Sequence, residues 1–495
     1  MFGSVVEAVM HFAEQLCNKT AIVTDNSEIT YNDLKQGILS YASQLSERGI
    51  KNGDKVILAS NHTVQFVEMY CAVHWLGAVN VVVEKKASIK SLSQLIESIS
   101  PKLIILNQAE IGADCYDSFT VSDFTITKGN YEPGSLADIL FTTGTTGMPK
   151  GVMLSHRNEV AGALNVITGG EMSQQDINLL TMPLHHAFGL TTLRAVLYNG
   201  GTVVLQDGVA SVKKINENIH VHSCNTIYMV PAALRVLYFQ TRQRLDLLLG
   251  DIEKIEFCTA PLDKKMRLVL SEQLKGTRLY NSYGATESAR TVYMRLDKNP
   301  EKITAIGRAV ENVSIWIVDD DRRKIDSSKT HFGHLAIRGN MNMMGYYNDP
   351  KTTQSVLSKG IFYSEDLGYM DKDGYIYLIG RNNDVINTGG EKVSPLEIEN
   401  TALEYIGVRE CACIGVEDMR GILGYIPVLY ITEETGHTVD VGNLKKYLEG
   451  HLEHYKVPHE IIVIDEIPKN QIGKIDRGSL KKLWEVNTED KGECS

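Results

Sequence analysis

Residues 142–151, TTGTTGMPKG, combine the residue types that bind phosphate groups. Glycine permits backbone conformations in which successive N–H groups converge on an anion. The threonine hydroxyls offer further donors, and the ammonium group of Lys150 is a compact positive charge that suits a phosphate. The segment directly follows the strand-like run ADILF at 137–141. We therefore predict a phosphate-binding loop in a nucleotide site.

This loop differs from the Walker motif, in which Gly-Lys-Ser/Thr follows a four-residue spacer. Here Met148 and Pro149 separate Gly147 from Lys150, and Gly151 follows. The alternative interpretation is an ordinary surface turn, which is the commonest meaning of threonine- and glycine-rich sequence. The ten residues contain no acidic residue and no large apolar residue other than the methionine, which favours the phosphate-binding loop.

A second polar cluster, NSYGATE at residues 281–287, combines Asn, Gly and Thr with a carboxylate. We predict a loop whose backbone meets a ligand while Glu287 reaches a metal–phosphate complex. The alternative is a turn capped by Asn281 and Thr286, and this cluster alone does not decide between the two.

Three more clusters follow towards the C-terminus. Residues 363–368, YSEDLG, place acidic residues at a predicted strand end, where Asp366 suits the hydroxyl groups of a ribose. The pair Gly380 and Arg381 comes next, and the polar loop 468–477 carries Lys474 after a glycine. Taken singly, these clusters are equally compatible with solvated turns.

Together and in this order, the clusters resemble the adenylate-forming superfamily. This superfamily comprises acyl-CoA synthetases, coumarate–CoA-type aryl ligases, firefly luciferases and the adenylation domains of nonribosomal peptide synthetases. The resemblance covers nearly the whole chain, from residues 31–34 to the terminal loop with Lys474. It includes Gly339, Gly345 and Tyr346 and the segment 389–399. In motif, the chain is most similar to fatty-acid– and aryl-acid–CoA ligases.

The resemblance implies a two-step reaction that requires ATP, Mg²⁺ and coenzyme A. A carboxylic acid is first converted to an acyl adenylate with release of pyrophosphate, and a thiol then displaces AMP. The favoured acceptor is the thiol of coenzyme A. The alternative acceptor is the phosphopantetheine thiol of an acyl carrier protein, with identical chemistry.

Two further interpretations belong to other classes of protein. A non-catalytic binding protein of the same fold is disfavoured, because the chain keeps Glu287, Asp366, Arg381 and Lys474. Luciferase-like oxidation has no support in the sequence beyond the shared fold.

The resemblance also implies roles for individual residues. The catalytic candidates are Lys474, which would bridge the carboxylate and α-phosphate oxygens, Glu287, which would help to place Mg²⁺, and His186, which would gate the acid site. Asp366 and Arg381 would bind the ribose hydroxyls. The nucleotide- and cofactor-binding candidates are Thr142, Thr143, Gly144, Thr145, Thr146, Gly147, Lys150, Ala260, Pro261, Asn281, Tyr283, Gly284, Thr286, Asp366, Arg381, Gly389 and Gly390.

The segment MPLHHAFG at residues 182–189 resembles the segment that borders the acyl pocket of the family. Amino-acid-activating relatives place an aspartate near this position, whereas this chain has His185 and His186 without a nearby acidic residue. A fatty or aryl acid is therefore preferred to an amino acid. Apolar residues at the pocket positions are equally compatible with core packing. The predicted lining is His185, Tyr228, Val230, Cys258, Ala285 and Ser288.

The elements that must position these residues alternate between short β-rich runs and helical stretches from Ala21 to Val209. This alternation predicts the α/β class, with layered αβ sheets and mainly parallel strands. Short strands with Gly and Asp turns predict a β-rich subdomain at about 304–380, inside an N-terminal domain of residues 1–380 that binds ATP and the acid. A smaller α+β domain, 385–495, carries Lys474.

The polar segment 381–384 is predicted to be the hinge between the two domains. Family resemblance implies that the small domain rotates between the two steps. Lys474 then withdraws, and the segment with Gly389 and Gly390 lines the thiol tunnel. Asn383 occupies the hinge position where many relatives have Asp or Lys, and asparagine tolerates unusual backbone angles.

Composition excludes several classes of partner. The 495 residues carry a formal net charge of −11, which disfavours a nucleic-acid groove. No apolar run approaches the roughly 18 residues that a membrane helix requires, and no basic leader with a long apolar core is visible. We therefore expect a cytoplasmic enzyme without an integral membrane segment.

Overall fold

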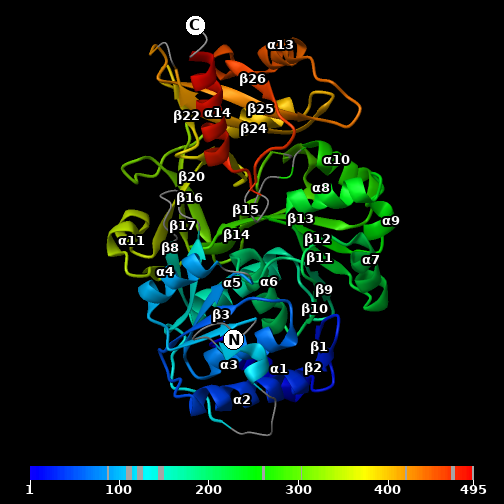
Figure 1. Cartoon of the computed structure of the whole chain (residues 1–495), viewed down its shortest axis with the longest axis vertical. Coiled ribbons are helices and arrows are strands. Elements are labelled where there is room, and N and C mark those ends of the chain that lie inside the picture. Colours follow the sequence, from blue (N-terminus) through cyan, green and yellow to red (C-terminus); the bar gives the residue numbers. More distant parts are fainter. Residues whose placement is uncertain are drawn as a thin grey trace.

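The computed structural model describes residues 1–85, 88–107, 114–119, 126–142, 150–258, 262, 264–302, 304–418, 421–469 and 474–492. Figure 1 shows a smaller upper part, formed by the C-terminal residues in orange and red, above a larger lower part. The predicted α/β class, with a large N-terminal and a small C-terminal part, is confirmed. No helix within these ranges is long and apolar enough to cross a lipid bilayer.

One sheet carries the hairpin that flanks the predicted phosphate loop. Its strand order is β18-β8-β7-β4-β3-β5-β6, with parallel pairing from β7 to β6 and antiparallel pairing at β8 and β18. Its strands are β3 Lys55–Ala59, β4 Val79–Val83, β5 Leu103–Leu106, β6 Asp114–Cys115, β7 Leu136–Thr142, β8 Lys150–Ser155 and β18 Gly345–Tyr346. The helices that precede or connect its first three strands in the sequence are α1 Val5–Gln15, α2 Tyr31–Glu47, α3 Val64–Trp75 and α4 Ile89–Ile99.

A second sheet has the order β15-β14-β13-β12-β11-β9-β10-β1-β2 and is parallel from β1 to β13. Its strands are β1 Thr20–Val23, β2 Glu28–Thr30, β9 Ile177–Leu180, β10 Thr202–Leu205, β11 Thr226–Met229, β12 Lys254–Phe257, β13 Arg278–Ala285, β14 Ser288–Arg295 and β15 Arg308–Ala309. The connecting helices are α5 His156–Gly169, α6 Ala187–Tyr198, α7 Val212–Val221, α8 Pro231–Gln240, α9 Asp246–Leu249 and α10 Lys264–Gln273.

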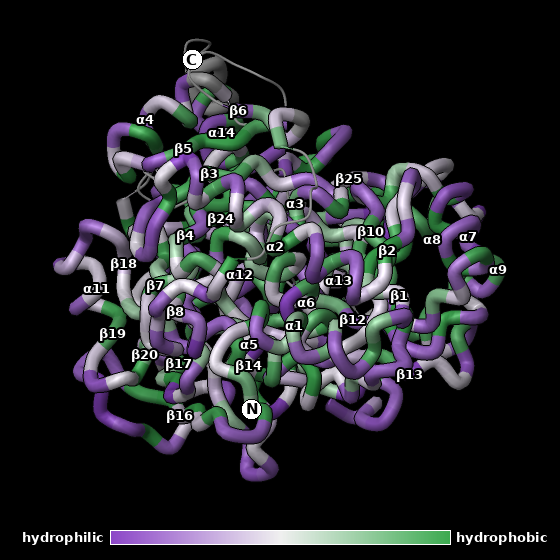
Figure 2. Tube along the Cα trace, turned by 90° about the horizontal axis from the view of Figure 1, so that it is seen from below, coloured by the Kyte–Doolittle hydropathy of each residue, from purple (hydrophilic) through white to green (hydrophobic). Residues whose placement is uncertain are grey.

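Hydrophobic runs and helix caps explain why these segments adopt their structures. In β4 all five residues are buried, as expected for a parallel strand that is covered on both faces. Helix α2 begins with a capping box between Thr30 and Asp33, and Ser155 and Asn158 form another at α5. In Figure 2 hydrophilic segments such as those around α11 and β16 lie at the periphery. The predicted alternation of short strands and helices between Ala21 and Val209 is confirmed.

Residues 314–381 form an antiparallel sheet beside the large sheets (Figure 1). It contains β16 Ser314–Val318, β17 Gly333–Arg338, β19 Leu357–Ser358, β20 Ile361–Met370 and β21 Ile376–Arg381, and α11 Pro350–Val356 lies between β18 and β19. The prediction that Asp366 stands at a strand end is wrong. Strand β20 continues through it, and the register against β17 shifts between His334 and Ala336 because three residues of β20 bulge there.

The predicted loop at residues 281–287 is also corrected. Residues Asn281 to Ala285 belong to β13, and only Thr286 and Glu287 form the turn to β14. Strand β13 pairs with β12 on one side and β14 on the other, so Asn281 is held in a ladder despite its preference for turns, while Gly284 lies where the register against β14 shifts. Glu287 therefore stands at the tip of a tight hairpin.

The C-terminal part has its own two sheets, β22-β23 and β24-β25-β26. Its strands are β22 Ile386–Thr388, β23 Glu391–Val393, β24 Val408–Glu417, β25 Tyr425–Glu433 and β26 Glu460–Val463, and its helices are α12 Pro395–Ala402, α13 Val441–His451 and α14 Arg477–Gly492. Residues 382–384 form the turn between β21 and this part, and Asn383 is exposed there.

Among the described residues, two ion pairs join the C-terminal part to the rest of the chain. Lys265 of α10 pairs with Glu434, and Lys329 pairs with Glu397 of α12 at 2.9 Å. The Ser394 hydroxyl also donates a hydrogen bond to the carbonyl oxygen of Ile379. The C-terminal part is thus held in one orientation by polar contacts at its base.

A buried charged network lies under the β7–β8 hairpin. The Asp138 carboxylate of β7 accepts hydrogen bonds from Tyr70 Oη at 2.8 Å, from His74 Nε2 at 2.9 Å and from the Arg194 guanidinium. Arg194 also pairs with Glu159 of α5 at 3.2 Å, and all five side chains are buried. Burial opposes ionisation of Asp138, but the charge of Arg194 and the bond from His74 lower its pKa overall. The network connects α3, α5 and α6 to the strand that leads into the predicted phosphate loop.

Candidate active site

Tyr346 links two segments of the site. One is the β13–β14 hairpin, which carries Glu287, and the other is strand β8, which begins at Lys150. Strand β18 pairs with β8, which places Tyr346 opposite Val152. Its hydroxyl donates a 2.8 Å hydrogen bond to Glu287 Oε1, and the Lys150 ammonium group lies 5.4 Å from the centre of its ring. Glu287 and Lys150, predicted from separate motifs, are thus brought to one place.

Thr142 and Lys150 are paired residues at the loop end of the β7–β8 hairpin. The predicted phosphate loop is the connection between them. Most of its residues, and the predicted adenine turn, lie outside the described part of the chain: Thr143, Gly144, Thr145, Thr146, Gly147, Ala260 and Pro261.

A second group of polar side chains surrounds Asp366. Tyr283 Oη donates a 2.5 Å hydrogen bond to Asp366 Oδ2, and Arg381 Nε lies 3.6 Å from Asp366 Oδ1. Asp366 and Arg381 are also cross-strand partners in β20 and β21. Burial and the negative charge of Asp366 raise the pKa of Tyr283 well above its usual value. Tyr283 therefore stays a neutral donor, and the carboxylate beside it stays an acceptor.

Lys474 approaches both groups from the C-terminal part. Burial and the positive charge of Arg381 lower the pKa of Lys474, while its attraction to Cys258, Asp366 and Glu287 raises it. The lysine also acts on His186, whose pKa is lowered to about 3 by burial, by His185 and by Lys474. Lys474 therefore interacts electrostatically with Glu287, Asp366, Arg381 and His186, the four residues that the sequence predicted for catalysis and ribose binding.

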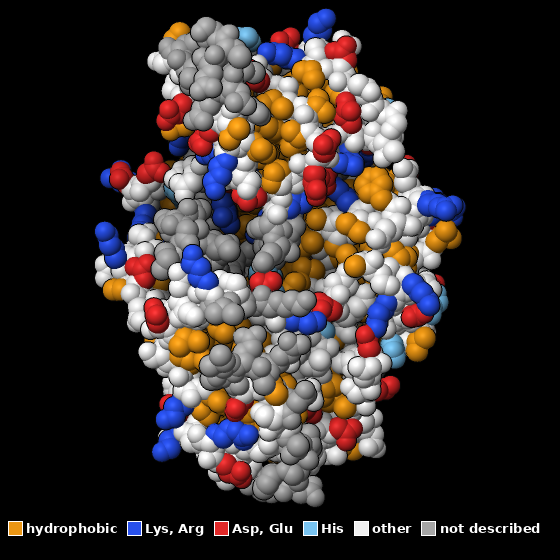
Figure 3. Space-filling view, viewed as in Figure 1, with side chains coloured by type: hydrophobic (Ala, Val, Ile, Leu, Met, Phe, Trp, Pro, Cys, Tyr) orange, Lys and Arg blue, Asp and Glu red, His pale blue; other side chains and the backbone are white. Residues whose placement is uncertain are grey.

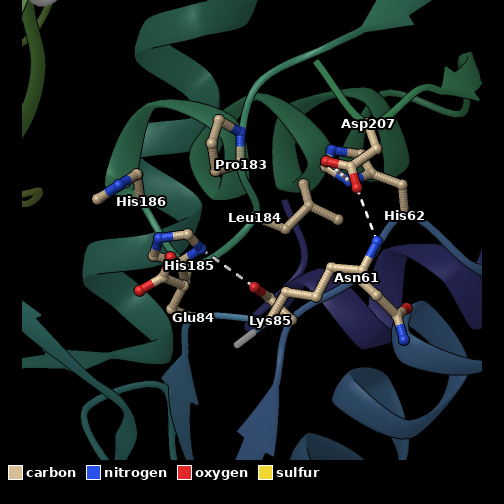
Figure 4. Close-up of a pocket in the computed structure, with 10 residues that line it drawn as sticks. Asn61, His62, Glu84, Lys85, Pro183, Leu184, His185, His186 and Asp207 are labelled. Carbon is tan, nitrogen blue, oxygen red and sulfur yellow. Dashed lines mark hydrogen bonds and ion pairs between the residues drawn. The ribbon is translucent and has the colours of Figure 1, made fainter. Parts of the chain in front are cut away.

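His185 and His186 lie at the start of α6, beside a pocket of about 240 Å³ (Figure 4). His185 Nδ1 lies 3.1 Å from the Ser60 hydroxyl, and its ring centre is 4.1 Å from that of His186. Burial and His62 lower the pKa of His185 to about 4, so both imidazoles are neutral near pH 7. His186 Nε2 is buried and has no hydrogen-bond partner among the described residues.

Other residues predicted to line the acid pocket are buried, and two of them are already engaged by protein groups. Tyr228 Oη donates to Asn178 Oδ1 at 3.0 Å, and Ser288 Oγ donates to Asn342 Oδ1 at 2.7 Å. Val230 and Cys258 are 8% and 4% exposed, and Gly284 and Ala285 are partly exposed at the end of β13. The amide of the predicted nucleotide contact Asn281 is also buried, and donates to the Ile306 carbonyl oxygen at 3.1 Å.

Gly389 and Gly390 form the two-residue turn of the β22–β23 hairpin. Their φ angles are +59° and +91°, and Thr388 pairs with Glu391 across the turn. A turn with two positive φ angles favours glycine at both positions. A Cβ atom on Gly389 would lie 3.2 Å from the Leu423 side chain, so the hairpin leaves little room for a larger residue at position 389.

A divalent cation fits the donor set at Glu287. Mg²⁺ prefers oxygen ligands and usually takes one or two carboxylates together with phosphate oxygens and water. The Glu287 side chain is partly exposed at a hairpin tip, and only one of its oxygens accepts the Tyr346 hydroxyl. Sequence reasoning noted Tyr346 within a motif but assigned it no role; a long-range contact of this kind has no local signal.

Basic side chains frame the site on the face seen in Figure 3, where blue Lys and Arg side chains lie along the junction between the two parts of the molecule. Arg381, beside Asp366, is half-exposed. Basic side chains of this kind attract anionic ligands despite the negative net charge of the chain.

A nucleotide-activating enzyme is the class that this arrangement indicates. The family model for AMP-binding enzymes matches residues 9–347, and that for the C-terminal domain of AMP-binding enzymes matches residues 397–474. The chain therefore belongs to the AMP-binding enzyme family.

Relatives across this family are similar over almost their full lengths. A 2-succinylbenzoate–CoA ligase of Geobacillus sp. (strain WCH70) is 26% identical, with 98% of each chain covered. An indoleacetate–CoA ligase of Aromatoleum aromaticum is 27% identical, with 94% of this chain and 95% of the relative covered. The structure of o-succinylbenzoate CoA synthetase (MenE) from Bacillus subtilis in complex with the acyl-adenylate intermediate OSB-AMP matches with a TM-score of 0.85 at 25% identity, covering 96% of this chain and 97% of that one.

The shifted pKa of Lys474 predicts an alkaline limit to adenylation. As pH rises, Lys474 should lose its proton below 10.5, the ordinary value for lysine, and kcat/KM for pyrophosphate release should fall with it. His186 and His185, with pKa values of about 3 and about 4, should add no acid limb between about pH 5 and 8. In a Lys474→Arg variant the residual activity should lack the alkaline limb; an unchanged limb would assign it to another group.

Proposed function

We propose that the protein is an AMP-forming carboxylic acid–CoA ligase. It converts an acid and ATP to an acyl adenylate and pyrophosphate, and then transfers the acyl group to the thiol of coenzyme A with release of AMP. The observation that carries this proposal is the convergence of Lys474 with Glu287, Asp366, Arg381 and His186. The CoA ligase names of the relatives support coenzyme A, rather than a carrier protein, as the acceptor.

In the first step, a carboxylate must approach a phosphate of the same charge sign, so positioning and charge stabilisation dominate catalysis. Lys474 supplies a compact cation between the two reacting groups, where negative charge increases in the transition state. Its position among Asp366, Glu287 and His186 supports this role. Neutral His186 is able to hydrogen-bond the acid without adding a charge that would compete with the lysine.

Nucleotide binding is assigned to the groups on either side of Lys474. Asp366, already hydrogen-bonded by Tyr283, would accept hydrogen bonds from the ribose hydroxyls with help from Arg381. Lys150 and the hairpin that it shares with Thr142 would hold the β- and γ-phosphates. Mg²⁺ bound at Glu287 would neutralise phosphate charge.

For the acid, we infer an aryl or arylalkanoic substrate in preference to a long-chain fatty acid. Relatives named as CoA ligases of 2-succinylbenzoate and indoleacetate support this choice. Fatty-acid metabolism is therefore the less fitting context.

Pyrophosphate release across a panel of carboxylic acids tests the proposed function. The panel should contain benzoic, phenylalkanoic, indole-acetic, dicarboxylic and fatty acids, with coenzyme A present or omitted. Acyl-CoA formation that needs coenzyme A alone is the expected result. Turnover that requires a phosphopantetheinylated carrier protein would identify the alternative acceptor, and no release with any acid would indicate a non-catalytic binding protein.

We further propose that residues 1–380 and 385–495 move as two bodies about residues 381–384. An Asn383→Pro variant should impair thioester formation more than adenylation, because proline fixes φ near −65° and restricts the residue before it. The two half-reactions are measured separately, by pyrophosphate release and by acyl-CoA formation from supplied acyl adenylate. Asn383→Ala keeps the backbone free and should leave both rates close to wild type; equal loss of both in the proline variant would contradict a pivot here.

A further inference from the structure

Arg290 is a buried cation that contacts Phe188, a residue of the segment predicted to border the acid pocket. It follows Ser288 by two residues on β14, is 3% exposed and has a φ of +53°. Its guanidinium carbon lies 4.3 Å from the centre of the Phe188 ring, two residues along the chain from His186. Electrostatic interactions also connect it with Tyr228 and Tyr293. The arginine therefore lies behind the residues predicted to contact the acid.

The two terminal nitrogens of this guanidinium are fully engaged. Nη1 donates to Glu256 Oε1 and to Ser282 Oγ, the latter at 2.7 Å, and Nη2 donates to Thr192 Oγ1 at 2.8 Å. Glu256 is as deeply buried as Arg290, so the positive charge has its counterion in the protein. A second carboxylate placed here would therefore lack a partner of its own.

The Nε–H group of Arg290, by contrast, is buried and has no hydrogen-bond partner among the described residues. The same is true of His186 Nε2, two residues before Phe188 in the chain. A buried donor without an acceptor is costly, and such groups in native proteins call for an explanation. The nearby hydroxyl of Thr192 accepts from Nη2 of the same guanidinium, and no described side chain accepts from Nε.

We propose that Arg290 determines specificity, and that its Nε–H donates a hydrogen bond to a neutral oxygen of the substrate acid, such as a ketone, along the chain between its carboxylate and its far end. This inference rests on the proposed function. The carboxylate of the acid lies near His186 and Lys474, and the internal oxygen reaches Arg290. Arg290 offers one free donor, and Glu256 already neutralises its charge. The site therefore favours a substrate with a single neutral acceptor over one with an alkyl segment or a second carboxylate at this position.

Matched pairs of acids that differ by one carbonyl group test the proposal. Wild-type enzyme is assayed for pyrophosphate release with 4-phenylbutanoate against 4-oxo-4-phenylbutanoate, and with the 3-oxo and 5-oxo members of the phenylalkanoate series against their methylene analogues. The best oxo acid should show a kcat/KM about 10- to 100-fold above that of its analogue, because a site with a fixed donor rejects a ligand that leaves it unpaired.

A double variant isolates the contribution of Arg290. Glu256→Gln combined with Arg290→Met removes the donor without leaving a buried carboxylate unpaired, and it should reduce the oxo preference to about 1. The control is Arg295→Met on the same strand, whose guanidinium pairs with Asp297 and Glu171 near the surface; its preference should equal that of wild type.

The outcomes separate this inference from the proposed function. Acids turned over by wild type without any oxo preference would overturn the role of Arg290 and leave the ligase assignment intact. No pyrophosphate release with any acid would instead overturn the ligase assignment. Should the double variant fail to fold, the wild-type comparison alone still decides, because it needs no substitution.

Discussion

Replacing Lys474 by alanine should lower the rate of adenylation by on the order of 10²–10³, the usual effect of losing one preorganised group that stabilises transition-state charge. Thioester formation from supplied acyl adenylate should be largely retained. Pyrophosphate has already left at that stage, so Lys474 no longer has to stabilise the charge that develops as the carboxylate attacks the α-phosphate. The structure explains the size of the effect. Lys474 interacts electrostatically with Glu287, Asp366 and His186. It belongs to the C-terminal part of the chain, whose sheets are separate from the large sheets.

The measurement is a pair of half-reaction rates, pyrophosphate release and acyl-CoA formation from supplied acyl adenylate. Lys481→Ala is the matched control, since Lys481 is exposed on α14 in the same part of the chain. Its two rates should equal those of wild type. Adenylation that survives intact in Lys474→Ala would show that another group performs this role.

Replacing Arg194 by methionine should destabilise the protein by about 3–5 kcal/mol, the range for removing one partner of a buried ion pair. Arg194 is 2% exposed and contacts Tyr70, Asp138 and Glu159. Methionine fills much of the volume, so the loss comes mainly from the Asp138 carboxylate that remains without its cation. Because Asp138 lies on β7, we also expect weaker binding of ATP at the β7–β8 hairpin.

Urea unfolding and thermal unfolding measure this loss. Arg157→Met, on the exposed side of α5, is the matched control and should change the free energy of unfolding by less than about 0.5 kcal/mol. A second variant, Asp138→Asn with Arg194→Met, should recover part of the stability, because it removes the unpaired buried charge. Wild-type stability of Arg194→Met alone would mean that the network contributes little.

Local sequence was sufficient to predict the alternation of strands and helices and to single out candidate site residues, because each motif is a short run of special residue types. Strands and helices alternate between Ala21 and Val209 as predicted. Local composition failed where pairing with distant strands overrides it. Asn281 suits a turn, yet it pairs with Phe257 of β12 and Met294 of β14.

Long-range contacts between side chains could not be predicted in this way. Tyr346 meets Glu287 across 59 residues, and Arg290 meets Glu256 across 34. An arginine on an antiparallel strand gives no local sign that it will be buried under a phenylalanine of α6. Such pairs depend on the packing of whole sheets, which a single sequence without its fold does not specify.

The ion pairs that join the C-terminal part to the large sheets make its orientation sensitive to ionic strength. Lys265 and Glu434 are partly exposed, as are Lys329 and Glu397, and salt screens such pairs while leaving apolar cores intact. In dilute buffer they favour the orientation that places Lys474 in the site. At high salt that preference weakens while each part stays folded. If the two parts move as proposed, the salt concentration should therefore change the ratio of the two half-reaction rates without any bound regulator.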